Sequence, residues 1–144
     1  MSIRPVVPAD HGALIALWQA EPSIRLRPED RFEPFCAYLA RNPGLSLVAE
    51  RDGQLVGSLM VGHDGRRGYL QHLLVIPALR RRGVAKALLD EALGRLQKEG
   101  VHKSHVFVLS DSAPALAFWA AQAGWDARED IQVYSTRQSV EALS

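Results

Sequence analysis

Residues 73–85 read Leu-Leu-Val-Ile-Pro-Ala-Leu-Arg-Arg-Arg-Gly-Val-Ala, and this stretch decides the fold. Its apolar first part predicts the end of a buried strand, which Pro77 closes. Its last residues begin the clearest helix pattern in the chain, an apolar stripe made of Val84, Ala85, Leu88, Leu89, Ala92, Leu93 and Leu96. A second apolar strand is predicted at Val106–Leu109. Because a helix joins the two strands, we expect them to lie parallel in one sheet.

The segment before this stretch has the shorter period of strands. Leu45–Glu50, Gln54–His63 and Tyr69–Val75 are predicted strands, and Asp52-Gly53 is a strong hairpin signal between the first two. Short turns connect all three strands, so they should be antiparallel neighbours.

The two ends of the chain complete the element order. A strand is predicted at Ile3–Val6, a helix from Ala9 onward and a second helix over Asp30–Arg41. Pro114 begins a last helix, and Ile131, Val133 and Tyr134 indicate a final strand. The order β-α-α-β-β-β-α-β-α-β predicts an α+β fold: one domain over 1–144, with a mixed, mostly antiparallel sheet and helices on both faces.

Composition limits the class of protein. The chain has 144 residues, 47% of them hydrophobic and 23% charged, with a net charge of +1, which excludes disordered, collagen-like and disulfide-scaffold proteins. Cys36 is the only cysteine; it excludes an intramolecular disulfide, fits a reducing compartment and is expected to pack as a small hydrophobe. No signal peptide or membrane span is visible, so we expect a cytoplasmic protein without a membrane partner.

Four cations stand around the start of the 84–98 helix. Arg80, Arg81, Arg82 and Lys86 occupy positions where a positive charge costs about 0.3–1 kcal/mol each against the helix dipole. A bound phosphate would reverse this cost, and small residues at Gly83 and Ala85 let a ligand approach the backbone. Two alternatives stay open: a solvated surface cluster, and a contact with nucleic acid.

The stretch 73–85 also resembles the acetyl-CoA motif of the GNAT superfamily, whose core is Arg/Gln-x-x-Gly-x-Gly/Ala. Residues 115–119 and Gly124-Trp125 are similar to the later Ala-x-x-Phe-Tyr…Gly-Phe motif of that superfamily. The predicted element order agrees with the GNAT core along nearly the whole chain. The resemblance implies an N-acyltransferase that moves an acetyl group from acetyl-CoA to a primary amine of a small molecule, peptide or protein. It leaves the acceptor unidentified and makes a homodimer an ordinary outcome.

The same resemblance implies where coenzyme A binds. Its pyrophosphate would lie on the N–H groups of residues 81–86, and its pantetheine arm would pair with the strand backbone at 73–75. That strand would part from the parallel one, and the thioester would lie near Gln71 and Tyr69. The residues implied in donor binding are Leu73, Leu74, Val75, Arg80, Arg81, Arg82, Gly83, Val84, Ala85, Lys86, Ser112 and Trp119.

The catalytic positions of the superfamily do not carry over. The tyrosine of its later motif is Trp119 here, the asparagine that commonly begins that helix is Ser112, and one glutamate position is Phe107. None of these side chains supplies the usual acid or base, so substitutes must be sought on the strand that carries the donor.

Tyr69 and His72 are the two substitutes on that strand. Alternation places Tyr69 with residues 71, 73 and 75 on one face and His72 on the other, unless a bulge intervenes. We therefore expect Tyr69, or an ordered water, to protonate the leaving thiolate, and His72 to be a core histidine in support. The amine can also lose its proton to water, with the enzyme supplying proximity.

Other functions have weaker support in the sequence. His102 and His105 have no cysteine partners, so no metal site is expected. The alternatives to an enzyme are a silent acyl-CoA sensor and a nucleic-acid-binding protein that uses the arginine cluster. We expect no nucleic-acid partner, because the net charge of +1 lacks the basic excess typical of such proteins.

Overall fold

The computed structural model describes residues 1–137, in which the chain divides into two compact units. The first unit is Met1–Phe107, and the second begins at Val108. The first contains a five-stranded sheet with the strand order β1-β2-β3-β4-β5. The second contains helix α4 (Ala113–Ala120).

The sheet has the predicted topology. Its strands are β1 (Ser2–Pro5), β2 (Leu47–Arg51), β3 (Gln54–His63), β4 (Gly68–Val75) and β5 (Ser104–Val106). The pairs β2–β3 and β3–β4 are antiparallel, and β4–β5 is parallel. Asp52 and Gly53 have φ values of 52° and 77°, which are the left-handed conformations that a tight hairpin turn requires.

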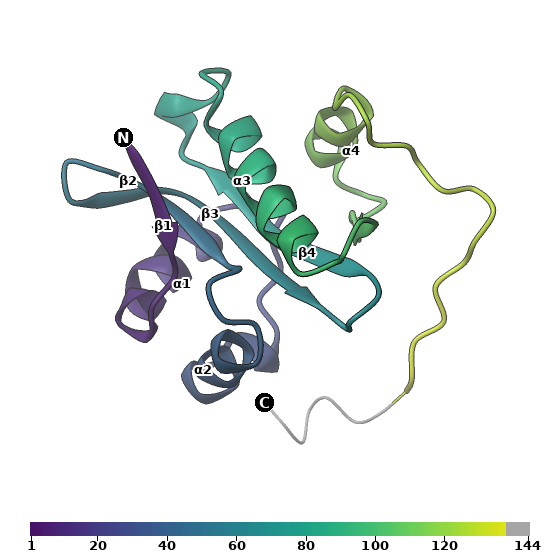
Figure 1. Ribbon diagram of the computed structural model, residues 1–144. Coiled ribbons are helices and arrows are strands. Elements are labelled where there is room, and N and C mark those ends of the chain that lie inside the picture. The colour runs from purple at the N-terminus through teal and green to yellow at the C-terminus, as the bar shows by residue number, and fades with distance from the viewer. Residues whose placement is uncertain (138–144) are drawn as a thin grey trace. The chain divides into compact units, whose positions relative to one another are not determined.

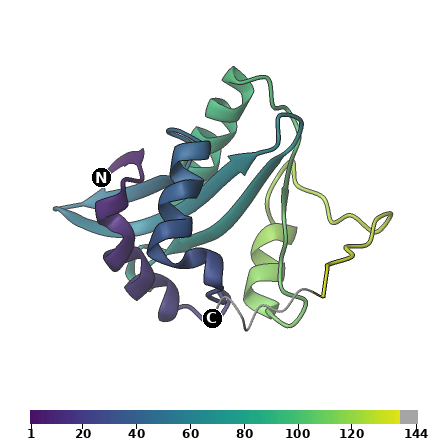
Figure 2. The ribbon, with the colours of Figure 1, turned by 90° about the horizontal axis from the view of Figure 1, so that it is seen from below.

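Helices cover both faces of this sheet, as the element order predicts. Helices α1 (His11–Gln19) and α2 (Phe32–Arg41) lie on one face, and α3 (Val84–Lys98) lies on the other (Figures 1 and 2). The face below α1 and α2 has a core of buried apolar side chains: Val6, Leu14, Trp18, Phe35, Val48, Met60 and Leu74. Cys36 is half-buried against this core, in line with its predicted packing role.

Helix α3 confirms the apolar stripe that the sequence predicts. Its buried residues are Val84, Leu88, Leu89, Ala92 and Leu96. Gly100 (φ 83°) ends the helix in the left-handed conformation, and the Val101 N–H donates a 3.0 Å hydrogen bond to the Leu96 carbonyl. Strand β4 leads, through the 3-10 turn Pro77–Leu79, to a well-packed helix whose first residue, Val84, is buried.

The strand predictions near the C-terminus are wrong in two respects. Strand β5 covers Ser104–Val106 rather than 106–109, because its register follows Gly68–Leu70 of β4, and Phe107 is 68% exposed. The expected strand at 131–134 is absent: residues 125–137 form neither helix nor strand, and Tyr134 is 90% exposed. Alternating apolar residues supply one face of a strand but not the partner whose backbone it must pair with.

No helix within residues 1–137 is both long enough and apolar enough to cross a membrane.

Candidate active site

Strand β4 loses its β5 partner halfway along its length. Strand β5 pairs with β4 only at Gly68–Leu70, and beyond that point the described part of the chain offers β4 only β3 as a neighbour. The Ile76 N–H donates to the Val56 carbonyl of β3 at 2.9 Å, so alternation turns the backbone groups of Val75 and Leu73 away from β3. This half of β4 is an edge at which an extended ligand can pair.

The open edge leads to the N-terminus of α3, where the backbone is free to bind an anion. Gly83 is the N-cap residue with a φ of 83°, and no side chain caps the first turn of the helix. A Cβ at Gly83 would meet nothing within 4 Å, and the flanking Arg81 and Arg82 are exposed. Unpaired N–H groups, the helix dipole and two exposed cations fit the pyrophosphate of coenzyme A.

Arg80 has a different environment from its two neighbours. Its Nε donates to the Val75 carbonyl at 3.0 Å and its Nη2 to the Glu21 carboxylate at 2.8 Å. Burial favours the neutral form of Glu21, but hydrogen bonds from Ser23 and the charge of Arg80 outweigh it and lower the pKa of Glu21. The Arg80 guanidinium is therefore already paired with a carboxylate. Lys86 similarly pairs with Asp90 at 2.7 Å on the surface of α3.

The predicted alternation along β4 is wrong at His72, because the strand contains a bulge. Ser58 and Met60 of β3 face Leu74 and Gln71 of β4, so three steps on β4 oppose two on β3. His72 has a φ of 53°, a left-handed conformation that is uncommon for a residue with a side chain. Its ring lies 4.6 Å from that of Trp18, so the bulge turns His72 toward α1.

Tyr69 lies on this same face of the sheet. It is opposite Gly62 of β3, where a Cβ would lie 2.5 Å from the Tyr38 hydroxyl of α2. Directly opposite residues of paired strands share a face, so Tyr69 also points to the α2 side. Its half-buried ring is 6.0 Å from His105 and 6.2 Å from Phe107. Tyr69 and His72 thus lie on one face of the sheet. Strict alternation predicted opposite faces for them, and the bulge interrupts that alternation.

A carboxylate that the sequence did not indicate completes this group. Asp30 is the last residue of the 3-10 turn Pro28–Asp30, and its Oδ1 accepts a 2.9 Å hydrogen bond from Nε2 of His72. Its Oδ2 accepts the Arg27 N–H at 2.9 Å. Burial works to raise the pKa of Asp30, but the hydrogen bonds from His72 and Arg27 outweigh it and the pKa is lowered. Asp30 is 42 positions from His72 along the chain, and no local pattern links them.

The second unit contains the remaining predicted donor residues. Ser112 is the N-cap of α4 but makes no side-chain capping hydrogen bond. Trp119 lies on α4, with its ring centroid 5.2 Å from Phe118 and 4.8 Å from Trp125. These ring contacts position Trp119 within this unit, and its contact with the donor stays a prediction.

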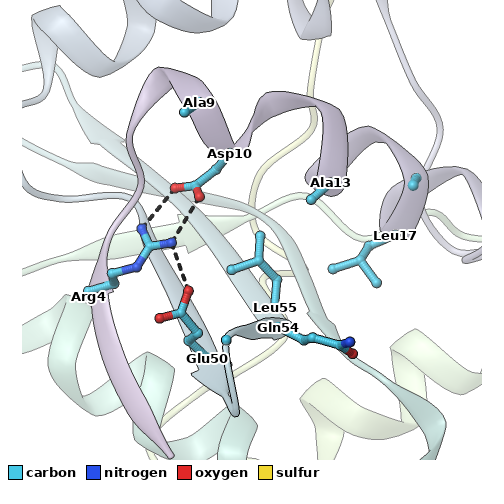
Figure 3. A pocket seen from close by; sticks show the side chains of 10 residues that line it. Arg4, Ala9, Asp10, Ala13, Leu17, Glu50, Gln54 and Leu55 are labelled. Atoms are coloured by element: carbon cyan, nitrogen blue, oxygen red, sulfur yellow. Dashed lines mark hydrogen bonds and ion pairs between the residues drawn. The ribbon is translucent and has the colours of Figure 1, made fainter.

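A surface hollow of about 430 Å³ lies at the other end of the sheet, beside β1 and the β2–β3 hairpin (Figure 3). Arg4 forms two 2.9 Å ion-pair hydrogen bonds with Asp10 and one of 3.1 Å with Glu50. Asp10 also accepts the Val7 N–H at 2.8 Å. These charges satisfy one another, so the hollow is lined by a structural ion cluster.

The sequence profile of the Acetyltransferase (GNAT) family matches residues 13–125. The chain belongs to this family. An acetyltransferase of Pectobacterium atrosepticum is 38% identical over 120 residues, which cover 83% of this chain and 84% of that protein. An acetyltransferase of Yersinia enterocolitica is 36% identical over the same length, with the same coverage of both chains. This GNAT protein is therefore an N-acetyltransferase that uses acetyl-CoA as the acetyl donor, as the two motifs implied.

Solved structures show the same fold. An aminoglycoside antibiotic 6'-N-acetyltransferase of Acinetobacter haemolyticus has a TM-score of 0.74 at 22% identity, covering 96% of this chain and all of that one. A predicted acetyltransferase of Clostridium acetobutylicum, solved with acetyl-CoA, has a TM-score of 0.68 at 17% identity, covering 93% of this chain and 95% of that one. The GNAT fold that the resemblance implied is confirmed. Within residues 1–137, no group of three or more His, Cys, Asp or Glu side chains could hold a metal ion.

Proposed function

We propose that this GNAT protein acetylates a primary amine on the sheet face covered by α1 and α2, at the bulge of β4. One observation carries the proposal: within residues 1–137, β4 has no neighbouring strand on its β5 side from Gln71 to Val75, and it leads toward a helix N-terminus without a side-chain capping hydrogen bond. An extended thioester bound along that edge would have its phosphates at α3 and its acetyl end at the bulge. The side chains that face the acetyl end are then Tyr69 and His72.

Donor binding is divided between backbone and cations. Leu73, Leu74 and Val75 offer the strand edge, and residues 81–86 offer the N–H groups of the helix start. Arg81 and Arg82 add charge, whereas the side chain of Arg80 holds the loop through Val75 and Glu21. The fit of coenzyme A to these residues is supported by the open space at Gly83. The proposal places Val84, Ala85 and Lys86 in the same first turn, and Ser112 and Trp119 remain proposed donor contacts from the second unit.

The transfer needs one proton to leave the nitrogen and one to reach the sulfur. Acetyl-CoA supplies an acetyl thioester, and the reaction forms a C–N bond while the C–S bond breaks. The Tyr69 hydroxyl is the proposed donor of the proton to sulfur, because Trp119 holds the position of the usual tyrosine. Loss of a positioned general acid lowers a rate by roughly 10²–10⁴-fold.

The acceptor belongs to the class of primary amines, whether on a small molecule, a peptide or a protein. We extend the proposal to one acetyltransferase domain built from both units, which the profile match over residues 13–125 supports. We propose the cytoplasm as the compartment, supported by the single cysteine. A homodimer stays a prediction that light scattering tests.

Calorimetry combined with a thiol-release assay tests this function. We expect acetyl-CoA to bind the wild-type chain, and free thiol to appear with one member of a panel: a polyamine, an aminoglycoside, an amino acid and a peptide beginning with alanine. In Gly83→Val the strained φ and the added bulk should weaken acetyl-CoA binding at least tenfold while the fold is kept. Salt-sensitive binding to duplex DNA without binding of acetyl-CoA at millimolar concentration would contradict the proposal and favour the nucleic-acid alternative.

A further inference from the structure

We propose that His72 is the general base of the transfer and that Asp30 is the positioning residue that leaves its Nδ1 atom free to take the proton. This inference rests on the proposed function and deepens it. The observation behind it is a half-buried carboxylate, from a distant part of the chain, placed on one ring nitrogen of a strained histidine.

The hydrogen bond to Asp30 selects the tautomer of His72. The two side chains are each 14% exposed, and their Nε2–Oδ1 distance is 2.9 Å. The lowered pKa keeps the carboxylate of Asp30 ionised, so this carboxylate accepts and Nε2 must carry the hydrogen. In the neutral imidazole the other nitrogen, Nδ1, then has the free lone pair.

The Nδ1 atom is not sealed from solvent. Within residues 1–137 every polar side-chain atom sealed from solvent has a hydrogen-bond partner, and His72 forms a side-chain hydrogen bond only through Nε2. A purely structural histidine in a core would be expected to use both nitrogens. The ring that carries this nitrogen lies on the sheet face that His72 shares with Tyr69, beyond the point where β4 loses its β5 partner.

The strain at His72 is maintained by buried contacts. The Trp18 Nε1 donates to the Ser58 hydroxyl at 3.0 Å, and that hydroxyl donates to the His72 carbonyl at 2.8 Å. Trp18 and Ser58 are both fully buried. A left-handed conformation is strained for a residue other than glycine and persists only where its surroundings hold it. Here the surroundings hold the ring against Trp18 with one nitrogen on Asp30.

Two further groups, Arg27 and His11, interact with this pair. Asp30 is the carboxylate in contact with His72, and Arg27 acts on Asp30 through its N–H and its charge. From α1, the His11 Nε2–H donates to the carbonyl of Asp30 at 2.8 Å. The pair therefore contains one carboxylate and one imidazole, the arrangement that orients a general base in many enzymes.

Side chains of this protein can then both accept and donate the two protons that the transfer requires. As the C–N bond forms and the C–S bond breaks, Nδ1 of His72 takes the proton released by nitrogen, and the Tyr69 hydroxyl gives one to sulfur. Proton exchange with solvent restores both side chains. Asp30 keeps its negative charge throughout and stabilises the imidazolium.

NMR of ¹⁵N-histidine-labelled protein tests the tautomer without any acceptor. The chain has five histidines, and His72→Asn assigns the signal, since asparagine tolerates left-handed φ. We expect the His72 proton on Nε2 in the wild type. In Asp30→Asn the amide NH₂ should donate to Nε2 and shift the proton to Nδ1. Asp10→Asn, the matched change in the other ion cluster, should leave the tautomer unaltered. A wild-type proton on Nδ1 would overturn the proposal even if His72→Asn proves unstable.

Kinetics on the panel amine with the highest wild-type rate tests the role. We expect kcat to fall roughly 10²–10⁴-fold in His72→Asn and at least tenfold in Asp30→Asn, with KM for acetyl-CoA unchanged and the acid limb of the pH profile flattened. His102→Asn, in an exposed turn, is the control. An active wild type whose kcat survives both substitutions overturns this inference alone. A wild type that binds no acetyl-CoA and acetylates no amine overturns the proposed function and the base role together.

Discussion

Two clusters of charged side chains connect the sheet to the segments around α1. They differ in whether a hydrogen-bonding atom is left without a protein partner. At the β1 end, the Arg4 guanidinium donates hydrogen bonds to the carboxylates of Asp10 and Glu50 (Figure 3). At the β4 end, His72 gives one nitrogen to Asp30 and keeps the other free. Both clusters contain a half-buried cation or imidazole and a carboxylate, but only the second has an atom left for chemistry.

This difference is a usable criterion for separating structural ion pairs from sites. The pKa of Asp10 is lowered chiefly by its hydrogen bond to Arg4, whereas burial is the largest influence on Asp30 and opposes the hydrogen bonds that lower its pKa. We therefore expect substitutions at the β1 end to change stability and not rate. Substitutions at the β4 end should change rate or donor binding with little loss of stability.

Tyr69→Phe is expected to have the largest effect. It removes the proposed acid and preserves the ring that packs near His105, so the rate should fall roughly 10²–10⁴-fold while the melting temperature stays within about 2 °C. Thiol release and thermal denaturation measure the two quantities. Tyr38→Phe, the matched change on α2, should retain the rate. A loss confined to Tyr38→Phe would move the acid from β4 to α2.

Much of this framework could be predicted from residue patterns. The stripe in 84–98, the Asp52-Gly53 turn and the order of elements fixed the helices, the hairpin and the parallel crossover. These signals are local, because each depends on spacing within a few residues. The strand expected at 131–134 failed because pairing needs a partner that a local pattern cannot supply.

The catalytic end of the site depends on contacts that spacing does not contain. Perfect alternation separates Tyr69 from His72, and a single bulge brings them to one face. The hydrogen bonds that hold this bulge come from Trp18 and Ser58, and Asp30 approaches from a turn before α2. One signal was present in the sequence: a histidine within a mostly apolar strand, with polar Ser58 on the neighbouring strand.

Asp10→Ala should have the next largest effect, on stability. The change removes two charge-assisted hydrogen bonds to Arg4 and one from the Val7 N–H, at a carboxylate that is 10% exposed. We expect the free energy of unfolding to fall by about 1.5–3 kcal/mol, with kcat unchanged. Urea denaturation at neutral pH measures the loss. A rate that fell with unaltered stability would remove the distinction between the two clusters.

The arginine run should show a smaller effect that separates two adjacent residues. Arg82 is exposed beside the uncapped start of α3, so Arg82→Ala should weaken acetyl-CoA binding by about 1–2 kcal/mol. Arg80→Ala should weaken it less, because its guanidinium is already bound to Val75 and Glu21. Calorimetry on both variants gives the comparison. The reverse order would mean that Arg80 exchanges Glu21 for phosphate when the donor binds.

The smallest predicted effect is a response to acid that the two clusters share. A carboxylate whose pKa is lowered by folding contributes stability that is complete above its unfolded value of about 3.9 and is lost as the pH falls through the folded value. Asp10 and Asp30 both have lowered pKa values, so the wild type should lose stability below about pH 4. Asn cannot take up a proton there, so each Asn variant should approach the wild type as the pH falls. Both Asn variants should show this approach, because both carboxylates have lowered pKa values. Urea denaturation of the three proteins at pH 7, 4 and 3 measures these differences. A gap that widened in acid would show that the two carboxylates bind protons more tightly in the folded chain.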